Sequence, residues 1–421
     1  MIIEFLNNNN NVNLFFTNYE KYPKNNRVFF FLFHSILFNI RNNKQNFENT
    51  LNRYIKFNRK NISIIIKDEK LLSIMNYLKS LKESIAKNIY YKEIKEPRIS
   101  FISPIFNQVN YLYFYILSIQ NQKLKDYELI FVDDFSMDNS VDFIVQKKKE
   151  DKRIKLIRNK KNMGTLYSRF IGQKFAKANY SIFLDCDDLV LEDGIFKSYN
   201  HIIKYNLDIV QFHTIWQEKN SINLKYNIYK YNKIIYKPIL QYIYYYDYNS
   251  HNGDELNYAL WDKLVKTEIM HKAFKFIGDT YVKKKIIIHN DLIILYSLFQ
   301  MATSYQYINE IGYFYIRNNN NSTINSWKKP QIKKEIINSL FINIQFLFEK
   351  TNDIYLDKKF CIFKIQNYFK QYNTLFINLK NEEYYYIKNI IDKILNLNYI
   401  SAQDKLFLTK IELFILNMKE N

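Results

Sequence analysis

The chain has 421 residues, which is long enough for two or three domains with a sizeable hydrophobic core. Its formal net charge of +20 favours anionic partners such as nucleotides or phosphorylated lipids, although solvated lysine faces on helices explain such a charge more often. No recognisable nucleic-acid-binding motif accompanies the charge, and the two cysteines, Cys186 and Cys361, have no spacing that suits a disulfide framework or a zinc site.

The first part of the chain, residues 1–97, is predicted to be a mainly helical extension that ends at Pro97. Its most apolar stretch, residues 28–40, is shorter than the roughly 18 apolar residues that a membrane-spanning helix needs. An amphipathic helix that docks on the core or on a membrane surface fits this stretch better. Because the N-terminus also lacks a basic signal-peptide region, we expect a cytoplasmic protein, with peripheral contact to a membrane left open.

Strand-like and helix-like segments alternate from Ile99 onwards. Buried strands are predicted at residues 99–105, 127–132, 153–157, 180–184 and 207–213. Helices are predicted between them at residues 109–120, after Asp138 as N-cap, from near Gly164, and at residues 194–205. This alternation indicates right-handed crossovers and a parallel sheet, in which ligands bind at the carboxyl ends of the strands.

The second half of the chain gives less regular signals, and residues 214–258 are too rich in Tyr and Asn to assign. Residues 258–274 and 290–304 have the apolar spacing of helices. Residues 307–317 are typical of a strand or hairpin, and several amphipathic helices are predicted beyond Pro330.

Acidic residues follow the fourth predicted strand, in the stretch YSIFLDCDD. In an extended chain Asp185 and Asp187 point to the same side, because side chains alternate with a period of two. Paired carboxylates at a strand end suit Mg²⁺ or Mn²⁺, which prefer oxygen ligands. An acidic loop that caps the helix near Gly194 explains the same residues equally well, so the metal site and the cap remain alternatives at this point.

Two further polar clusters follow predicted strands. Asp133 and Asp134 end the second strand, where carboxylates can accept hydrogen bonds from a nucleotide base or ribose. Ordinary helix capping explains the other polar side chains of this stretch, Ser136, Asp138 and Ser140. In NMGTLYSR, Gly164 leads into a helix N-terminus with Arg169 one turn in, which suits an anionic group, although such a glycine is more often only a cap.

Taken in order, these segments resemble the family 2 glycosyltransferases with the GT-A fold. The similar segments are ISFISPIFN, LIFVDDFSMDNS, NMGTLYSR and the Asp-x-Asp segment YSIFLDCDD. The likeness continues through LWDKLVKTEI and HNDLIILYSLFQMATSYQYINEIGYFY, which are similar to the acceptor-side half of bacterial and protist members that build surface glycans.

The resemblance covers residues 98–318 and implies an α/β fold: a Rossmann-like, mostly parallel sheet flanked by helices. It divides this domain into a nucleotide-sugar half (98–213) and an acceptor half (214–318). Residues 1–97 and 319–421 would then be helical extensions before and after the transferase domain.

The resemblance also implies roles for individual residues. The nucleotide sugar would be bound by Pro104, Phe106 (where Tyr is common), Asn107, Asp133, Asp134, Gly164, Arg169, Asp185 and Lys263. Asp187 would be the foremost ligand of Mn²⁺ or Mg²⁺, together with Asp185. Asp291 would be the catalytic base of an inverting transfer, in a pair that reads Asn290-Asp291 where the family has Glu-Asp. For Lys263, a solvated helix lysine is an equal alternative to a lysine that faces the diphosphate.

The implied function is metal-dependent transfer of a sugar from a nucleotide-sugar donor, a UDP-sugar first of all, to the hydroxyl of a glycan, lipid-linked or protein acceptor. A degenerate, non-catalytic transferase-like domain that binds a glycan or a partner is the main alternative, because Asn290 replaces the family's Glu. A phosphoacceptor signalling domain and an Asp-x-Asp phosphatase explain less. The strand at 99–105 precedes the acidic pair, and Asp188-Leu189 stands where such phosphatases have Gly-Thr.

Overall fold

The computed structural model describes residues 91–216, 233–237, 259–315 and 330–350, together with isolated positions between 385 and 409. The predicted N-terminal extension up to residue 90 lies outside these described residues. So do most of the unassigned segment, the polar loop that follows it at 316–329, and nearly all of the chain after residue 350.

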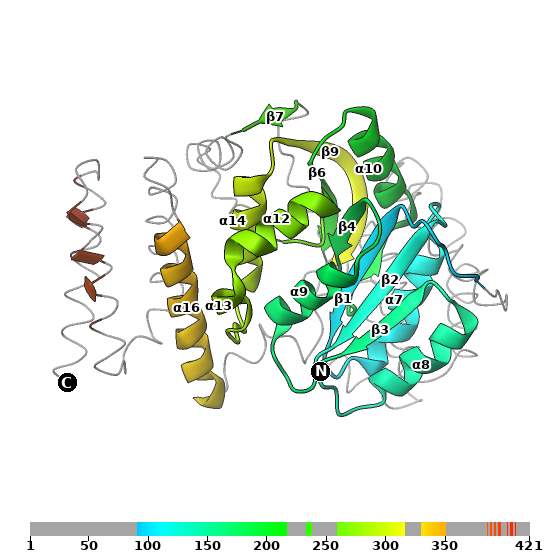
Figure 1. The fold of residues 1–421 in the computed structure, drawn as a ribbon, viewed down its shortest axis with the longest axis horizontal. Helices are drawn as coiled ribbons and strands as arrows, with labels where there is room; N and C mark the ends of the chain where they lie inside the picture. The colour runs from blue at the N-terminus through cyan, green and yellow to red at the C-terminus, as the bar shows by residue number, and fades with distance from the viewer. Residues whose placement is uncertain are drawn as a thin grey trace, which may run out of the picture.

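One mixed sheet forms the centre of the described residues, with helices on both of its faces (Figure 1). The order of its strands is β3-β2-β1-β4-β8-β6-β9-β5, and β7 pairs with β9. The strands are β1 (Ile99–Ile105), β2 (Tyr127–Asp133), β3 (Ile154–Arg158), β4 (Tyr180–Phe183), β5 (Leu189–Val190), β6 (Ile209–Trp216), β7 (Ile235–Tyr236), β8 (Lys263–Lys266) and β9 (Ser304–Tyr315).

The nucleotide half of the sheet is parallel, as predicted: β1 pairs in parallel with β2 and β4, and β2 with β3. The acceptor half adds antiparallel pairs, because β8 runs antiparallel to both β4 and β6. In β1 the buried side chains alternate between the two faces, so that Phe101 joins one hydrophobic core and Ile102 the other. A strand buried on both faces reads as a continuous apolar run, which is why the sequence identified it.

Two layers of helices cover the sheet. The helices are α7 (Val109–Gln120), α8 (Ser140–Glu150), α9 (Thr165–Phe175), α10 (Glu192–Lys204), α12 (Thr267–Ile277), α13 (Asp279–Val282), α14 (Asn290–Met301) and α16 (Pro330–Lys350). Apolar residues of α9, α12, α14 and α16 share one core with one face of the sheet, and those of α7, α8 and α10 share the other core. Among the described residues, every helix is too short or too polar to cross a membrane.

Two local predictions are wrong. Residues 258–274 do not form one helix: strand β8 comes first, because its backbone pairs with β4 and β6, and α12 begins only at Thr267. Asp138 is not the N-cap of α8, since Asn139 holds that position. Instead, Asp138 Oδ2 accepts a hydrogen bond from the backbone N–H of Val109 (3.1 Å), at the first residue of the neighbouring helix α7.

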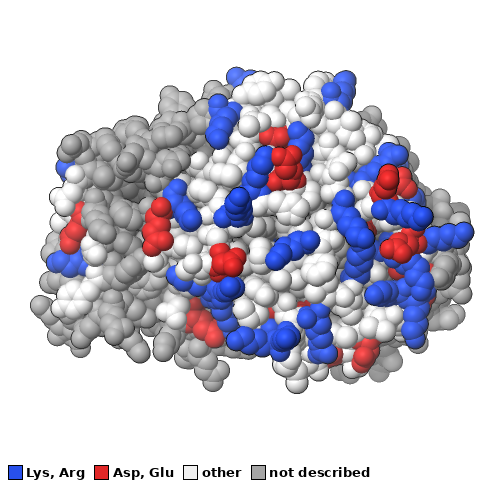
Figure 2. All heavy atoms as spheres, viewed as in Figure 1, with Lys and Arg blue, Asp and Glu red and all other residues white. Residues whose placement is uncertain are grey.

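The positive charge of the described surface is distributed rather than concentrated. On the face shown in Figure 2, Lys and Arg side chains are interspersed with acidic ones. On α8 the lysines Lys147, Lys148 and Lys149 lie in the last turn, where the helix dipole favours cations. This arrangement fits solvated lysine faces on helices.

Candidate active site

The loops after β1 and β2 are joined by hydrogen bonds at the carboxyl edge of the sheet. Asn107 has a left-handed backbone (φ 54°), and its side-chain oxygen accepts a bond from the N–H of Met137 (2.8 Å). The N–H of Asn107 donates to Ser136 Oγ (3.0 Å). Beside this junction Phe106 and Phe135 remain 45% and 41% exposed. The edge therefore presents two aromatic side chains on loops that are held in place.

Asp133 ends β2 and is completely buried. Its carboxylate accepts a bond from the backbone N–H of Ser136 (3.1 Å) and pairs with Arg158 Nε (3.0 Å). Arg158 is half exposed, and its guanidinium carbon lies 5.9 Å from the centroid of the Phe135 ring. The sequence did not single out Arg158, which brings a partly solvent-accessible positive charge to the same edge as Asp133.

Asp134 holds the loop that leads into α9. Its two carboxylate oxygens accept bonds from Asn159 Nδ2 (2.8 Å) and from the backbone N–H groups of Met163 (2.8 Å) and Gly164 (2.7 Å). Gly164 has a φ of 90°, a conformation that favours glycine. Asp134 and Gly164 therefore set the position of the α9 N-terminus, and through it the position of Arg169.

Arg169 joins the two halves of the predicted site. Its side chain is 3% exposed, and its Nη2 lies 3.1 Å from Asp185 Oδ1, at the end of β4. Its Nη1 donates to Asn290 Oδ1 (2.7 Å) and also to Asp291 Oδ1, both at the start of α14. Asp185, Arg169 and Asp291, which are far apart in the sequence, thus lie in direct contact. The sequence predicted these three as site residues but not this mutual pairing.

The pKa of Asp185 is raised to about 6. Burial is the main cause, and the nearby negative charges of Asp187 and Asp291 add to it, whereas Arg169 acts in the opposite direction. Asp185 remains 34% exposed and Asp291 31% exposed, so both carboxylates can be reached from solvent. The site therefore holds more negative charge than Arg169 compensates.

These carboxylates fit a divalent cation. Asp185, half-buried Asp187 and Asp291 lie around the one guanidinium of Arg169. Within the described ranges no group of three or more His, Cys, Asp or Glu residues is arranged to hold a metal ion by itself. Mg²⁺ commonly takes only one or two carboxylates, and substrate phosphates complete its shell. The residues present therefore suit a cation that is held jointly with a phosphate-bearing substrate.

Asp188 has a structural place beside the site. It is 1% exposed, and its Oδ2 accepts a hydrogen bond from the hydroxyl of Tyr313 on β9 (2.7 Å). Trp261 stacks on the Tyr313 ring at a centroid distance of 4.7 Å. On the other side of the turn, the Cys186 thiol donates to the Pro104 carbonyl (3.6 Å) at the end of β1. The turn that carries Asp185 and Asp187 is thus fixed by both neighbouring strands.

Lys263 is not a solvated helix lysine, because it lies on β8 and is 1% exposed. Its Nζ pairs with Asp262 Oδ1 (2.6 Å) and donates to the Ala259 carbonyl (2.7 Å). Burial lowers the pKa of Lys263 and raises that of Asp262, while the negative charge of Asp291 acts to raise the lysine pKa. Lys263 is thus close enough to interact electrostatically with the site, but its nearest partner is Asp262.

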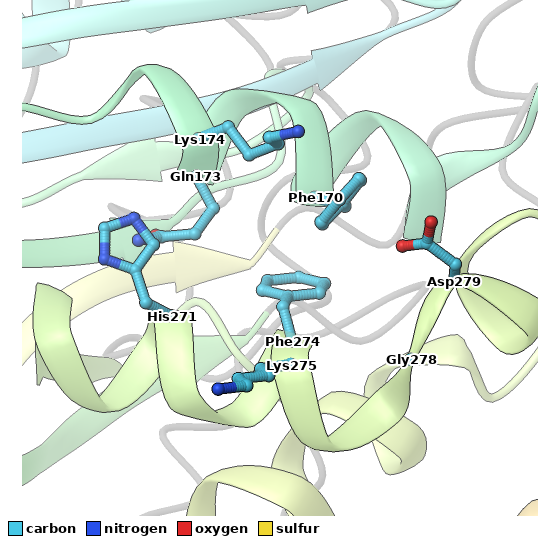
Figure 3. A pocket seen from close by; sticks show the side chains of 8 residues that line it. All are labelled: Phe170, Gln173, Lys174, His271, Phe274, Lys275, Gly278 and Asp279. Atoms are coloured by element: carbon cyan, nitrogen blue, oxygen red, sulfur yellow. The ribbon is translucent and has the colours of Figure 1, made fainter.

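A surface pocket of about 380 Å³ lies between α9 and α12, and it contains none of the predicted site residues. Figure 3 shows Phe170 and Phe274 facing this pocket from the two helices, and their ring centroids are 5.6 Å apart. Lys174 Nζ lies 5.1 Å from the centroid of the Phe170 ring. The pocket is therefore a separate feature beside the helix that supplies Arg169.

Changing Asp185 to Asn is expected to stabilise the metal-free protein at pH 7 but not near pH 4. Because the pKa of Asp185 is about 6 in the folded state, above that of an ordinary Asp, charging this carboxylate between pH 4 and 6 costs folding free energy. With allowance for solvent screening, we expect a gain of about 1–2 kcal/mol in the free energy of unfolding. Urea denaturation in EDTA at the two pH values measures it, and an equal effect at both would contradict the prediction.

Comparisons with known proteins agree with this geometry. Residues 100–256 match the model of the family described as Glycosyl transferase family 2. An uncharacterized glycosyltransferase of Haemophilus influenzae is 39% identical over 111 residues, which are 26% of this chain and 44% of that protein. The cholesterol galactosyltransferase of Borreliella burgdorferi is 28% identical over 230 residues, which are 52% of this chain and 59% of that protein.

A third relative is the poly(ribitol-phosphate) beta-N-acetylglucosaminyltransferase TarP of Staphylococcus aureus, 39% identical over 117 residues, or 27% of this chain and 35% of TarP. The chain thus spans less than two thirds of each of these three relatives. The crystal structure of S. aureus TarS 1–349 in complex with UDP-GlcNAc superposes with a TM-score of 0.56 at 13% identity, covering 76% of this chain and 89% of that structure. The superposition establishes a shared GT-A fold.

Proposed function

Because the chain carries a family 2 glycosyltransferase domain over residues 100–256, we propose that it transfers a sugar from a nucleotide-sugar donor to an acceptor hydroxyl. The observation that carries the proposal is the meeting of Asp185 and Asp291 at Arg169. One carboxylate follows a strand of the nucleotide half, and the other begins a helix of the acceptor half. A donor and an acceptor that bind to the two halves would therefore meet at this point.

The carboxyl edge of β1 and β2 is proposed to bind the nucleotide. Phe106 and Phe135 offer exposed aromatic faces, and Arg158 offers a partly exposed positive charge. Asp133 and Asp134 are saturated with protein hydrogen bonds, so they act by shaping this edge together with Pro104 and Asn107. Bound UDP-GlcNAc in the TarS structure supports a UDP-sugar as the first donor to test.

Asp187 and Asp185 are proposed to hold Mn²⁺ or Mg²⁺ together with the donor diphosphate. When bound, the cation would neutralise the charge that builds on the departing nucleoside diphosphate. Asp291 is proposed to take the proton of the acceptor hydroxyl as that oxygen attacks the anomeric carbon with inversion. Asp291 is suited to this role because it is 31% exposed and therefore open to an acceptor.

The acceptor class is proposed from the relatives. They include a poly(ribitol-phosphate) N-acetylglucosaminyltransferase and a cholesterol galactosyltransferase, so both glycan-like polymers and lipids belong in the first acceptor panel. A lipid acceptor would bring the protein to a membrane surface, and vesicles that contain the lipid should therefore be tested beside free polymer.

Asp187→Ala is expected to weaken the dependence of turnover on the cation. A panel of nucleotide sugars, assayed with Mn²⁺, with Mg²⁺ and in EDTA, should show one donor that the wild-type protein turns over only with metal. Loss of a carboxylate ligand should raise the Mn²⁺ concentration needed for half-maximal turnover by about tenfold or more. Asp193→Ala is a matched control, since Asp193 lies in the same acidic stretch but pairs with Lys123 at the surface. Turnover that is unaffected by EDTA would contradict the metal assignment.

A further inference from the structure

Arg169 has a geometry that suits the positioning of other side chains better than direct contact with a ligand. Its side chain is 3% exposed, and its two terminal nitrogens are engaged by Asp185, Asn290 and Asp291. Its Nε is buried and has no hydrogen-bond partner among the residues that the structure describes. The guanidinium group therefore lies behind the carboxylates, and these carboxylates are the part that solvent can reach.

We propose that Arg169 is the positioning residue of the transfer site, and that Asn290 is adapted to it by leaving the positive charge of Arg169 to Asp185 and Asp291. This inference rests on the proposed function. It assigns Arg169 to the side chains on which the reaction depends and not to the donor phosphates.

The planar guanidinium group explains why an arginine suits this place. It can direct separate N–H groups at carboxylates that come from different elements, which a single ammonium group cannot do with the same geometry. Asp185 follows β4, and Asp291 lies in the first turn of α14. One side chain on α9 thereby fixes the distance between the candidate metal ligand and the candidate base.

Packing holds Arg169 in this position. Its guanidinium carbon lies 5.8 Å from the centroid of the Phe183 ring at the end of β4. One turn further along α9, Gly172 packs so closely on β1 that an added Cβ would lie 2.4 Å from Ile102 Cγ2. At the start of the helix Asp134 fixes the Gly164 backbone. The helix cannot shift without disturbing these contacts, so Arg169 is held in a preorganised geometry.

Asn290 is the feature that distinguishes this chain from the Glu-Asp pattern of the family that it resembles. Asn290 is 9% exposed, and its amide oxygen accepts a bond from the same Nη1 that contacts Asp291. A Glu at this position would add a further carboxylate to a site that already has an excess of negative charge. A neutral amide accepts the hydrogen bond without competing for the positive charge. The substitution is therefore read as an adaptation and not as a sign of lost activity.

The first test is Arg169→Lys, which keeps the positive charge but loses the planar arrangement of donors. We expect kcat to fall by about 10- to 100-fold, because a displaced base and ligand miss the productive geometry. The donor KM should stay within about threefold of wild type, because the donor does not contact Arg169. Lys174→Ala, an exposed change on the same helix, should leave both constants unchanged. A raised donor KM with an unchanged kcat would overturn the proposal and return Arg169 to donor binding.

The second test is Asn290→Asp, which adds a charge at nearly constant size, beside Asn290→Glu, which restores the family's residue. Both are expected to lower kcat by about tenfold, because the new carboxylate competes with Asp291 for Arg169. A higher kcat for Asn290→Glu would overturn the proposed adaptation. These variants also decide the question if Arg169→Lys does not fold, as judged from its circular dichroism melting curve.

The two proposals fail in different ways. A wild-type protein that turns over no nucleotide sugar, alone or with acceptors, would overturn the proposed function and this inference with it. An active wild-type protein whose kcat is unchanged by Arg169→Lys would overturn this inference alone.

Discussion

Replacing Asp291 by Asn is expected to lower the turnover of sugar transfer by about 100- to 10,000-fold, the usual contribution of a positioned general base. The donor affinity should change by less than about threefold, since Asp291 is proposed to contact the acceptor hydroxyl and not the nucleotide. Asn is nearly isosteric, and its amide oxygen can still accept the hydrogen bond from Arg169. The fold should therefore persist. Single-turnover transfer from the donor identified in the panel, together with calorimetric titration of that donor, measures both quantities.

Asp279→Asn is the matched control for this experiment. Asp279 begins the short helix α13, its side chain is 78% exposed, and its only printed charge partner is the exposed Lys283. It should leave both turnover and donor affinity unchanged. Wild-type turnover by Asp291→Asn would refute the assignment of the base. Loss of donor affinity together with turnover would instead place Asp291 in donor binding.

The fold of the nucleotide half could be predicted closely because its strands are short apolar runs that are separated by helical periods. β1, for example, is buried on both faces, and its sequence ISFISPI shows this without any tertiary information. β8 could not be predicted, since KLVK lies inside a helical apolar period and becomes a strand only by pairing with β4 and β6. β5 is a two-residue strand within an acidic segment, and its state depends on pairing with the distant β9.

The site could be predicted as a set of residues but not as a network. Strand-end carboxylates such as Asp185 are visible in sequence, because parallel strands bring their carboxyl ends to one edge. Which side chain neutralises them depends on the relative positions of α9 and α14, and no local pattern reports this. The hydrogen bond of Tyr313 to Asp188 and the pairing of Asp262 with Lys263 are further examples. In the sequence Tyr313 is only one of several aromatic residues of an apolar strand.

Asp262→Leu is expected to destabilise the protein by about 3–5 kcal/mol at pH 7. Asp262 and Lys263 are each 1% exposed, so the change leaves an ammonium group without its carboxylate in a dry environment. Gln211 Nε2, which donates to Asp262 Oδ2 (2.8 Å), loses its acceptor as well. Urea denaturation of the variant and the wild type measures the loss in the free energy of unfolding. A loss below about 1 kcal/mol would refute the prediction, because it would lie in the range of surface ion pairs.

The pH dependence of this loss separates an unpaired charge from an ordinary packing defect. Burial already lowers the pKa of Lys263 in the folded state, and removal of Asp262 should lower it further. The unfolded chain then binds the proton more tightly than the folded chain, so the stability of Asp262→Leu should rise with pH by up to about 1.4 kcal/mol per unit. Asp262→Leu combined with Lys263→Met removes both charges and should recover most of the stability, with a pH dependence like that of the wild type. If the stable double variant also keeps its turnover, Lys263 serves the fold alone. If it loses turnover, the lysine supports Asp291 electrostatically, as their interaction across the site suggests.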